Sequence, residues 1–209
     1  MTDTTHPDRP ALEPARRDDG ARPLRADARR NRSRLLDAAT AVFAEAGTVA
    51  SLEDVARRAG LGIGTLYRHF PTRDDLIEAV IHDGVDDLVV RADELLAADD
   101  PFVALRTWLR DLVTHAASFR GLAKSMVAAT CGQGRLTDAC HRQEAAASAL
   151  VERARGAGAL RPDVRVDEVL DLVSAVAWVA EQGRPHDSGR LLDLVLDGLR
   201  APVGGRSER

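Results

Sequence analysis

The stretch SLEDVARRAGLGIGTLYRHF, residues 51–70, combines a short helical pattern, a turn and a second short helical pattern. In its first half, apolar residues recur at the spacing of one helix face, namely Leu52, Val55, Ala56 and Ala59. Gly60 follows as a residue that ends helices, and a second helix is expected over 63–70. The stretch therefore predicts two short helices joined by a glycine-containing turn.

The glycines Gly60, Gly62 and Gly64 raise a second interpretation, a loop that binds a nucleotide phosphate. Such a loop needs a β-strand before the glycines, and here a helical pattern precedes them. In the G-x-G-x-x-G spacing counted from Gly60, the last glycine position is Thr65, and the lysine of a P-loop is absent. The arrangement favours a helix-turn-helix, whose second helix enters a groove of DNA.

On a helical wheel of 63–70, Leu66 and Phe70 share one face and are expected to pack against the preceding helices. The opposite face is small, polar and basic, with Ile63 and Tyr67 on its flanks; it contains Gly64, Thr65, Arg68 and His69. Its hydroxyl and N–H donors suit phosphate oxygens, whereas Ile63 suits an apolar contact such as a thymine methyl. The alternative is an amphipathic hairpin whose polar face only meets solvent.

The rest of the chain also shows helical periodicity, without an alternating strand pattern or an internal repeat. The expected fold class is all-α, with about nine helices. They are expected at 29–46, 52–59, 63–70, 72–97, 101–117, 119–131, 136–155, 165–182 and 188–200. Ser51 with Asp54 and Thr72 with Asp75 form capping-box patterns at two helix starts.

Charge is distributed unevenly along the chain, although the formal net charge is only −4. Between Arg29 and Arg73 there are eight arginines against four acidic residues, whereas 82–209 carries 16 basic and 20 acidic residues. A local basic excess is expected where one segment meets a polyanion. Because neither a membrane-length apolar run nor a signal-peptide pattern is present, a cytoplasmic protein without membrane contact is expected.

The two cysteines, Cys131 and Cys140, make no disulfide framework, and reduced thiols are expected. With His141 and Glu144 they raise the question of a metal site. Their spacing matches no structural zinc pattern, and no second His-x-x-Glu pair accompanies them. We therefore expect no metal, no cofactor and no enzymatic activity.

The segment SLEDVARRAGLGIGTLYRHFPTRDDLIEAVI, residues 51–81, resembles the DNA-binding signature of TetR-family transcriptional regulators, and the likeness extends over about 29–88. Two positions depart from the family pattern: Gly62 stands where a serine N-cap is usual, and Arg73 where lysine is usual. The matching positions are Val55-Ala56, Ala59-Gly60, Gly64-Thr65-Leu66-Tyr67, His69-Phe70 and the basic Arg73.

The resemblance implies a role for each matching residue. Phosphate contacts would come from Ser51, Thr65, Tyr67, His69 and Arg73, while Ile63, Gly64 and Arg68 would lie nearest the bases. The basic residues Arg29, Arg30 and Arg32 would reach an adjacent minor groove or the backbone; a solvated helix face is the alternative. The implied division is a disordered arm at 1–28, a DNA-binding domain at 29–88, a ligand-binding and dimerisation domain at 89–200, and a flexible tail at 201–209.

The segment PFVALRTWLRDLVTHAASFRGLAKSM, residues 101–126, is similar to the SbtR-like group of C-terminal domains, through its W-L-x-x-L-V and R-G-L-A runs. This likeness names no ligand. A pocket is expected among the fourth to eighth helices, although an ordinary core position is the more common role for each candidate taken alone. The candidates are Trp108, Leu112, His115, Phe119, Leu122, Met126 and Trp178.

The last two expected helices, 165–182 and 188–200, are apolar on more than one side. A helix of that kind is buried on most sides, so a second copy of the chain is the expected cover, with an ordinary monomer core as the alternative. The predicted interface residues are Val169, Val173, Val176, Leu192, Val195, Leu196 and Leu199.

The sequence thus predicts a ligand-responsive, DNA-binding regulator, most simply a homodimeric repressor that a small effector releases from a palindromic operator. The alternative is a helical small-molecule-binding protein or enzyme whose N-terminal hairpin is only structural.

Overall fold

The computed structural model of the protein describes residues 21–47, 49–117, 136–181 and 188–202. These ranges contain eight helices and, outside them, one isolated β-bridge between Leu160 and Arg200, which confirms the all-α fold class. The helices are α1 (Ala21–Ala46), α2 (Leu52–Arg58), α3 (Ile63–His69), α4 (Arg73–Leu96), α5 (Pro101–Ala117), α7 (Thr137–Gly156), α8 (Val166–Glu181) and α9 (Ser188–Leu199). The helix expected at 119–131 lies outside the described residues.

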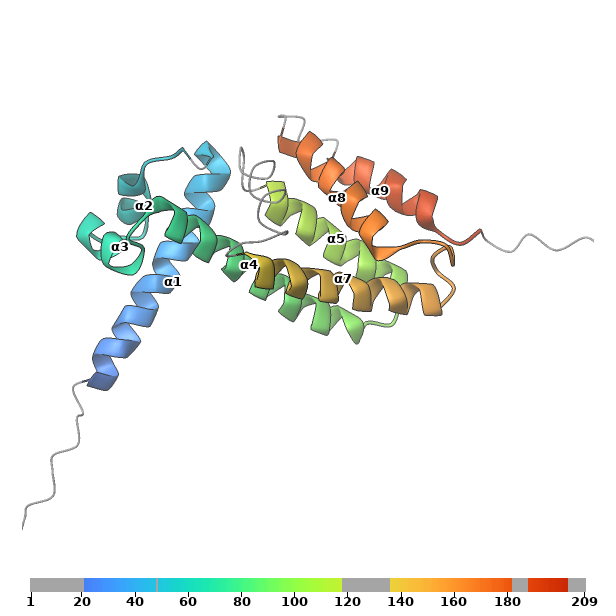
Figure 1. Cartoon of the computed structure of the whole chain (residues 1–209), viewed down its shortest axis with the longest axis horizontal. Coiled ribbons are helices and arrows are strands. Elements are labelled where there is room, and N and C mark those ends of the chain that lie inside the picture. Colours follow the sequence, from blue (N-terminus) through green and yellow to red (C-terminus); the bar gives the residue numbers. More distant parts are fainter. Residues whose placement is uncertain (1–20, 48, 118–135, 182–187, 203–209) are drawn as a thin grey trace, which may run out of the picture.

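Figure 1 shows two groups of helices, with α4 running from one to the other. The first group is α1, α2, α3 and the start of α4; the second is the rest of α4 with α5, α7, α8 and α9. The first helix begins at Ala21, earlier than the start expected at Arg29, so residues 21–28 are helical rather than part of a disordered arm. The prediction followed apolar periodicity, which reports burial, whereas alanine and arginine favour a helix without any burial.

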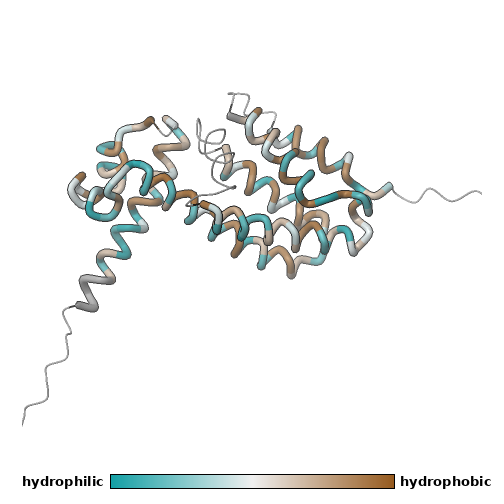
Figure 2. Tube along the Cα trace, viewed as in Figure 1, coloured by the Kyte–Doolittle hydropathy of each residue, from teal (hydrophilic) through white to brown (hydrophobic). Residues whose placement is uncertain are grey.

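Each group of helices has its own hydrophobic core, and α4 contributes to both. Phe43 and Leu66 are fully buried in the first core, and Trp108 is fully buried in the second. From α4, Val80 belongs to the first core and Leu88 to the second. Figure 2 shows hydrophobic and hydrophilic residues alternating along these helices, as expected for helices that bury one face.

One of the two predicted capping boxes forms. At the start of α4, the Thr72 N–H donates to Asp75 Oδ2 at 3.0 Å, and the Asp75 N–H donates to Thr72 Oγ1 at 3.1 Å. At the start of α2, Ser51 Oγ instead accepts the N–H of Glu53 at 3.1 Å. The predicted pairing of Ser51 with Asp54 is wrong, because Asp54 forms an ion pair with Arg57 one turn further on.

Two polar contacts hold the second group together. The indole Nε1–H of Trp108 donates to the carbonyl of Leu88 at 2.8 Å, which joins α5 to α4. Asp193 of α9 accepts hydrogen bonds from Arg106 at 2.9 and 3.0 Å and from Arg110 at 2.9 Å, both on α5. Arginine pairs of this two-pronged kind fix orientation as well as distance.

The redox state of Cys140 differs from the expectation. This residue of α7 is disulfide-bonded rather than a reduced thiol. Cys131, for which a reduced thiol is also expected, lies outside the described residues.

Replacement of Trp108 by alanine tests its place in the second core. The Trp108→Ala variant should lose about 3–5 kcal/mol of unfolding free energy, because it leaves a cavity and removes the bond to Leu88. Val103→Ala, at an exposed position of the same helix, is the matched control and should change stability by less than about 0.5 kcal/mol. Urea unfolding followed by circular dichroism measures both. Equal losses in the two variants would contradict this core.

Candidate nucleic-acid interface

The turn between α2 and α3 depends on Gly60. Its φ of 65° lies in the left-handed region, and the N–H of Leu61 donates to the carbonyl of Ala56 at 2.9 Å, a typical glycine-terminated helix end. A Cβ at Gly60 would lie 2.7 Å from a guanidinium nitrogen of Arg34. The Arg34 side chain of α1 therefore lies against the turn.

Two apolar side chains anchor α3 to the first core, as the helical wheel predicts. Leu66 is fully buried and Phe70, which ends the helix, is 3% exposed. The guanidinium of Arg32 lies 5.6 Å from the centre of the Phe70 ring, so α1 covers that anchor too. The opposite face of the short helix is therefore turned away from the protein.

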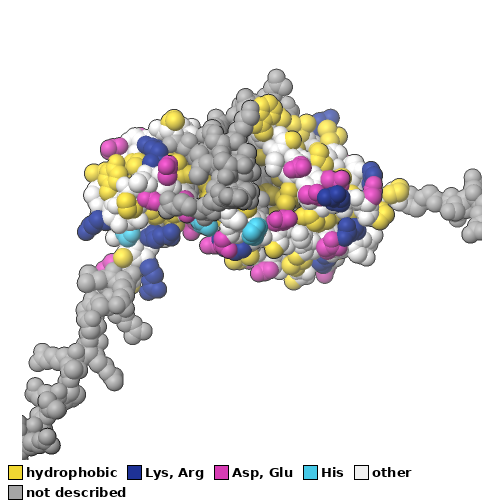
Figure 3. Space-filling model, in the orientation of Figure 1, with side chains coloured by type: hydrophobic (Ala, Val, Ile, Leu, Met, Phe, Trp, Pro, Cys, Tyr) yellow, Lys and Arg dark blue, Asp and Glu magenta, His cyan; other side chains and the backbone are white. Residues whose placement is uncertain are grey.

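This outer face of α3 carries the polar residues that the sequence places there. Gly64 and Arg68 are exposed, Tyr67 is 47% exposed, and Thr65 and His69 are half-buried. The guanidinium Nη2 of Arg68 donates to Thr65 Oγ1 at 3.0 Å, which holds both groups on one side. Figure 3 shows basic side chains around the helices of this first group.

Gly64 serves no visible purpose in the fold. It lies in a helix with an ordinary φ, and a Cβ built there would meet nothing within 4 Å. A glycine in a helix interior costs about 1 kcal/mol relative to alanine. The helix therefore carries a destabilising residue at an exposed position, where the backbone is left open to close approach from outside.

Two predicted phosphate-binding residues also hold the fold together. The Ser51 hydroxyl caps α2 and donates to Glu53 Oε2 at 2.6 Å. The Arg73 guanidinium donates through Nη1 to the carbonyl of Ala50 at 2.7 Å, which ties the start of α4 to the segment before α2. Both residues thus fix the elements on either side of α3.

The arginines of α1 lie on its exposed side. Arg29, Arg30 and Arg32 are all exposed, and Arg30 forms an ion pair with Asp27 within the same helix. Arg32 also lies over the Phe70 ring at the end of α3. The two alternatives for this segment, a DNA contact and a solvated helix face, are both compatible with that position.

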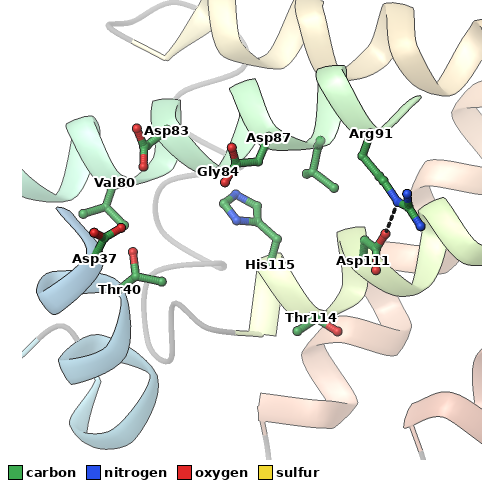
Figure 4. Close-up of a pocket in the computed structure, with 11 residues that line it drawn as sticks. Asp37, Thr40, Val80, Asp83, Gly84, Asp87, Arg91, Asp111, Thr114 and His115 are labelled. Carbon is green, nitrogen blue, oxygen red and sulfur yellow. Dashed lines mark ion pairs between the residues drawn. The ribbon is translucent and has the colours of Figure 1, made fainter. Parts of the chain in front are cut away.

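A cavity of about 620 Å³ lies between the two groups of helices. Its lining comes from α1, α4 and α5, and Figure 4 shows the His115 ring of α5 turned towards Gly84 of α4. A Cβ at Gly84 would collide with that imidazole, so the glycine makes room for it. Burial lowers the pKa of His115 to about 4, so the imidazole is neutral at physiological pH.

The predicted pocket residues do not share one site. His115 lines the cavity, whereas Trp108 and Leu112 are buried in the second core. Trp178 is 47% exposed on α8. Phe119, Leu122 and Met126 lie outside the described residues. Apart from Val80 and Leu88, the larger described side chains of the cavity are polar or charged, whereas mainly apolar wall residues were predicted.

The predicted dimer residues lie mostly inside the protomer. The large apolar side chains that α8 and α9 leave exposed are Leu172, Trp178 and Leu194, at 39%, 47% and 56%. Apolar periodicity identified the helices but not which of their faces is turned outward. Of the predicted set, Val195 and Leu199 are half-buried, and the remainder, Val169, Val173, Val176, Leu192 and Leu196, are buried.

Gly84 is the functional candidate that the sequence did not single out. The available signal was a glycine in the middle of a long helix, which is costly unless another group packs closely against it.

Among the described residues, no cluster of His, Cys, Asp and Glu side chains could hold a metal ion. None of the described helices has the length and hydropathy needed to cross a bilayer.

Comparison with known proteins agrees with this arrangement. Residues 35–80 match the family model of bacterial regulatory proteins of the tetR family, and residues 100–201 match the SbtR-like C-terminal domain of transcriptional regulators. The HTH-type transcriptional repressor KstR2 of Rhodococcus jostii is 28% identical over 190 residues, which span 82% of this chain and 92% of that relative.

Solved structures extend the likeness to the whole fold. A TetR transcriptional regulator from Streptomyces coelicolor is 38% identical with a TM-score of 0.69, over 82% of this chain and 99% of that chain. A TetR regulatory protein from Mycobacterium vanbaalenii is also 38% identical, with a TM-score of 0.64, over 85% of this chain and 99% of that one. With both family models and these two structures matched, the chain belongs to the TetR family of transcriptional regulators.

Proposed function

We propose that the protein is a homodimeric repressor that binds a palindromic operator through α3 and is released from it by a small effector. The observation that supports DNA binding is the outer face of α3, where polar and basic groups surround a glycine that the fold does not need. Thr65, Tyr67 and His69 would contact phosphates. The open backbone at Gly64, with Ile63 and Arg68 beside it, would face the bases.

Ser51 and Arg73 would each have two roles, one in the fold and one in DNA binding. The Arg73 guanidinium donates through Nη1 to the carbonyl of Ala50, and its positive charge would attract a phosphate at the same place. The Ser51 hydroxyl already donates to Glu53, so a phosphate contact from Ser51 requires that bond to be exchanged. Of the two, only Arg73 carries a positive charge, so it would be the stronger phosphate ligand.

The dimer would form through the exposed apolar side chains of α8 and α9. These two helices pack against each other, and each leaves large apolar groups outside. We define the α8–α9 outer face by Leu172, Trp178 and Leu194. Covering this face with a second copy would remove apolar surface from water and would place two α3 helices on one side of the dimer for adjacent major grooves.

The release of DNA would depend on α4. This helix carries Arg73 at its DNA-proximal end and lines the cavity with its middle part. A ligand in the cavity would contact α1 and α5 as well, so it would act on both groups of helices at once. Changing the bound population from 99:1 to 1:99 requires about 5.5 kcal/mol of differential affinity between the two conformations.

The experiment that tests the proposal is selection of DNA from a random duplex pool by the full chain. A palindromic consensus, bound in a salt-dependent manner, would support it. Failure to enrich any sequence would favour a helical small-molecule-binding protein whose hairpin is only structural.

The Gly64→Ala variant separates folding from DNA binding. It should unfold at the same or a higher temperature, because alanine favours the helix by about 1 kcal/mol and its Cβ meets nothing. Its affinity for the selected operator should fall, because the methyl group obstructs the approach of the duplex. Thermal melting and fluorescence anisotropy measure the two effects. Gly198→Ala, also open around the Cβ but far along in α9, is the control for the helix effect. Operator affinity equal to that of the parent would remove Gly64 from the interface.

The Tyr67→Phe variant tests one phosphate contact without altering the packing. Only the exposed hydroxyl is lost, so stability should not change. Operator affinity should fall about fivefold per subunit, the effect of one hydrogen bond of about 1 kcal/mol. Because the contact is to the backbone, the loss should be similar for the operator and for mismatched DNA. A loss confined to the operator would instead assign Tyr67 to base recognition.

Charged substitutions on the α8–α9 outer face test the dimer. Trp178→Asp and Leu194→Asp should give folded monomers, because a carboxylate buried in the interface without a partner costs several kcal/mol. Val90→Asp, at a position 59% exposed on α4, is the matched control and should stay dimeric. Sedimentation equilibrium gives the mass of each variant. Dimers in both interface variants would place the contact elsewhere.

A further inference from the structure

The lining of the cavity between α1, α4 and α5 is strongly acidic. Among the described residues it includes Asp37 from α1, Asp83 and Asp87 from α4, and Asp111 from α5, against one basic residue, Arg91. Figure 4 shows these carboxylates distributed over three helices around the His115 ring. The charge is therefore a property of the assembled cavity and not of one helix face.

Within the described lining, the one basic residue, Arg91, offsets only one of the four carboxylates. Arg91 donates to Glu94, outside the cavity, at 2.9 Å and lies 3.6 Å from Asp111. Within the described ranges, no salt bridge is formed by Asp37, Asp83 or Asp87. His115 adds no positive charge, because its imidazole is neutral. Outside the lining, the positive charge of Arg32 on α1 acts on Asp83.

The carboxylates also act on one another. Partial burial, followed by the negative charge of Asp87, raises the pKa of Asp83 above its usual value. Asp37 adds to this effect from α1, and the charge of Arg32 only partly opposes it. An unfavourable concentration of negative charge in a cavity is relieved when a cation enters, because the cation replaces repulsion by attraction.

The size and the remaining lining restrict the cation. A volume of about 620 Å³ lies in the range of sites for organic ligands and is far larger than a metal ion needs. Val80 and Leu88 supply apolar surface, and Thr40 and Thr114 supply hydroxyl groups. The lining thus combines several separated carboxylates with a smaller apolar part.

We propose that this cavity binds an organic cation with two basic nitrogens on an apolar or aromatic skeleton. The two charged ends would pair with carboxylates from different helices, α4 with α1 or α5, while the skeleton would lie against Val80 and Leu88. Such a ligand draws α1 and α5 towards α4 on either side of Gly84. In taking the cavity as the effector site, this inference rests on the proposed ligand-responsive function.

The test uses p-xylylenediamine as the probe and 1,4-benzenedimethanol, its neutral counterpart, as the matched ligand. Isothermal titration calorimetry on the full chain should show binding of the diamine and at least tenfold weaker binding of the diol. The double variant Asp83→Asn with Asp87→Asn should weaken diamine binding by about tenfold or more, the loss expected for charge-assisted hydrogen bonds. Asp93→Asn removes one carboxylate charge on an exposed part of α4 outside the cavity and should bind within twofold of the parent.

Several outcomes would overturn the cation site. These are absence of diamine binding, equal binding of the diol, and an equal loss in Asp93→Asn. The melting temperature of the double variant should be at least that of the parent, because the substitutions remove mutual repulsion; this shows that a loss of binding is not a loss of fold. DNA selection is measured separately. Selection of an operator without diamine binding overturns the cation site alone, and diamine binding without selection of DNA overturns the proposed function alone.

Discussion

The burial of α4 in two separate hydrophobic cores is the constraint on which the rest of the structure depends. Val80 is held by the first core and Leu88 by the second, only two helical turns apart on the same rod. A continuous helix transmits a displacement along its length, because its backbone hydrogen bonds resist bending. The positions of the two groups of helices are therefore linked through α4. The cavity lies between the two groups, beside the middle of this helix.

Gly84 gives this rod a particular property. A glycine weakens a helix interior, and here the weakness coincides with the point where the His115 ring of α5 packs directly on the backbone. Close packing without an intervening side chain means that a small displacement of α5 is felt by α4 at once. The middle of α4 lies between the two cores. It thus combines a glycine that weakens the helix with a tight contact to α5.

Basic and acidic side chains gather in different parts of the molecule. The outer face of α3 and the projecting part of α1 are basic, and the cavity beneath them is acidic. The division runs through α1 itself, which carries Arg29, Arg30 and Arg32 towards one end and Asp37 further along. A net charge of −4 conceals this arrangement, since opposite charges that cancel in the total act on different partners when they lie apart.

What the sequence determined was local. The anchoring of α3 by Leu66 and Phe70, the glycine turn at Gly60 and the capping box of Thr72 with Asp75 depend on residues within one or two helical turns, so spacing predicted them. The tertiary structure alone decided that Val173 and Leu192 face inward while Trp178 and Leu194 face outward, and that Gly84 receives His115 from another helix. It also decided that four aspartates from three helices surround one cavity. These features arise from contacts between residues far apart in the chain, and helical periodicity shows that a face is apolar without showing which neighbour covers it.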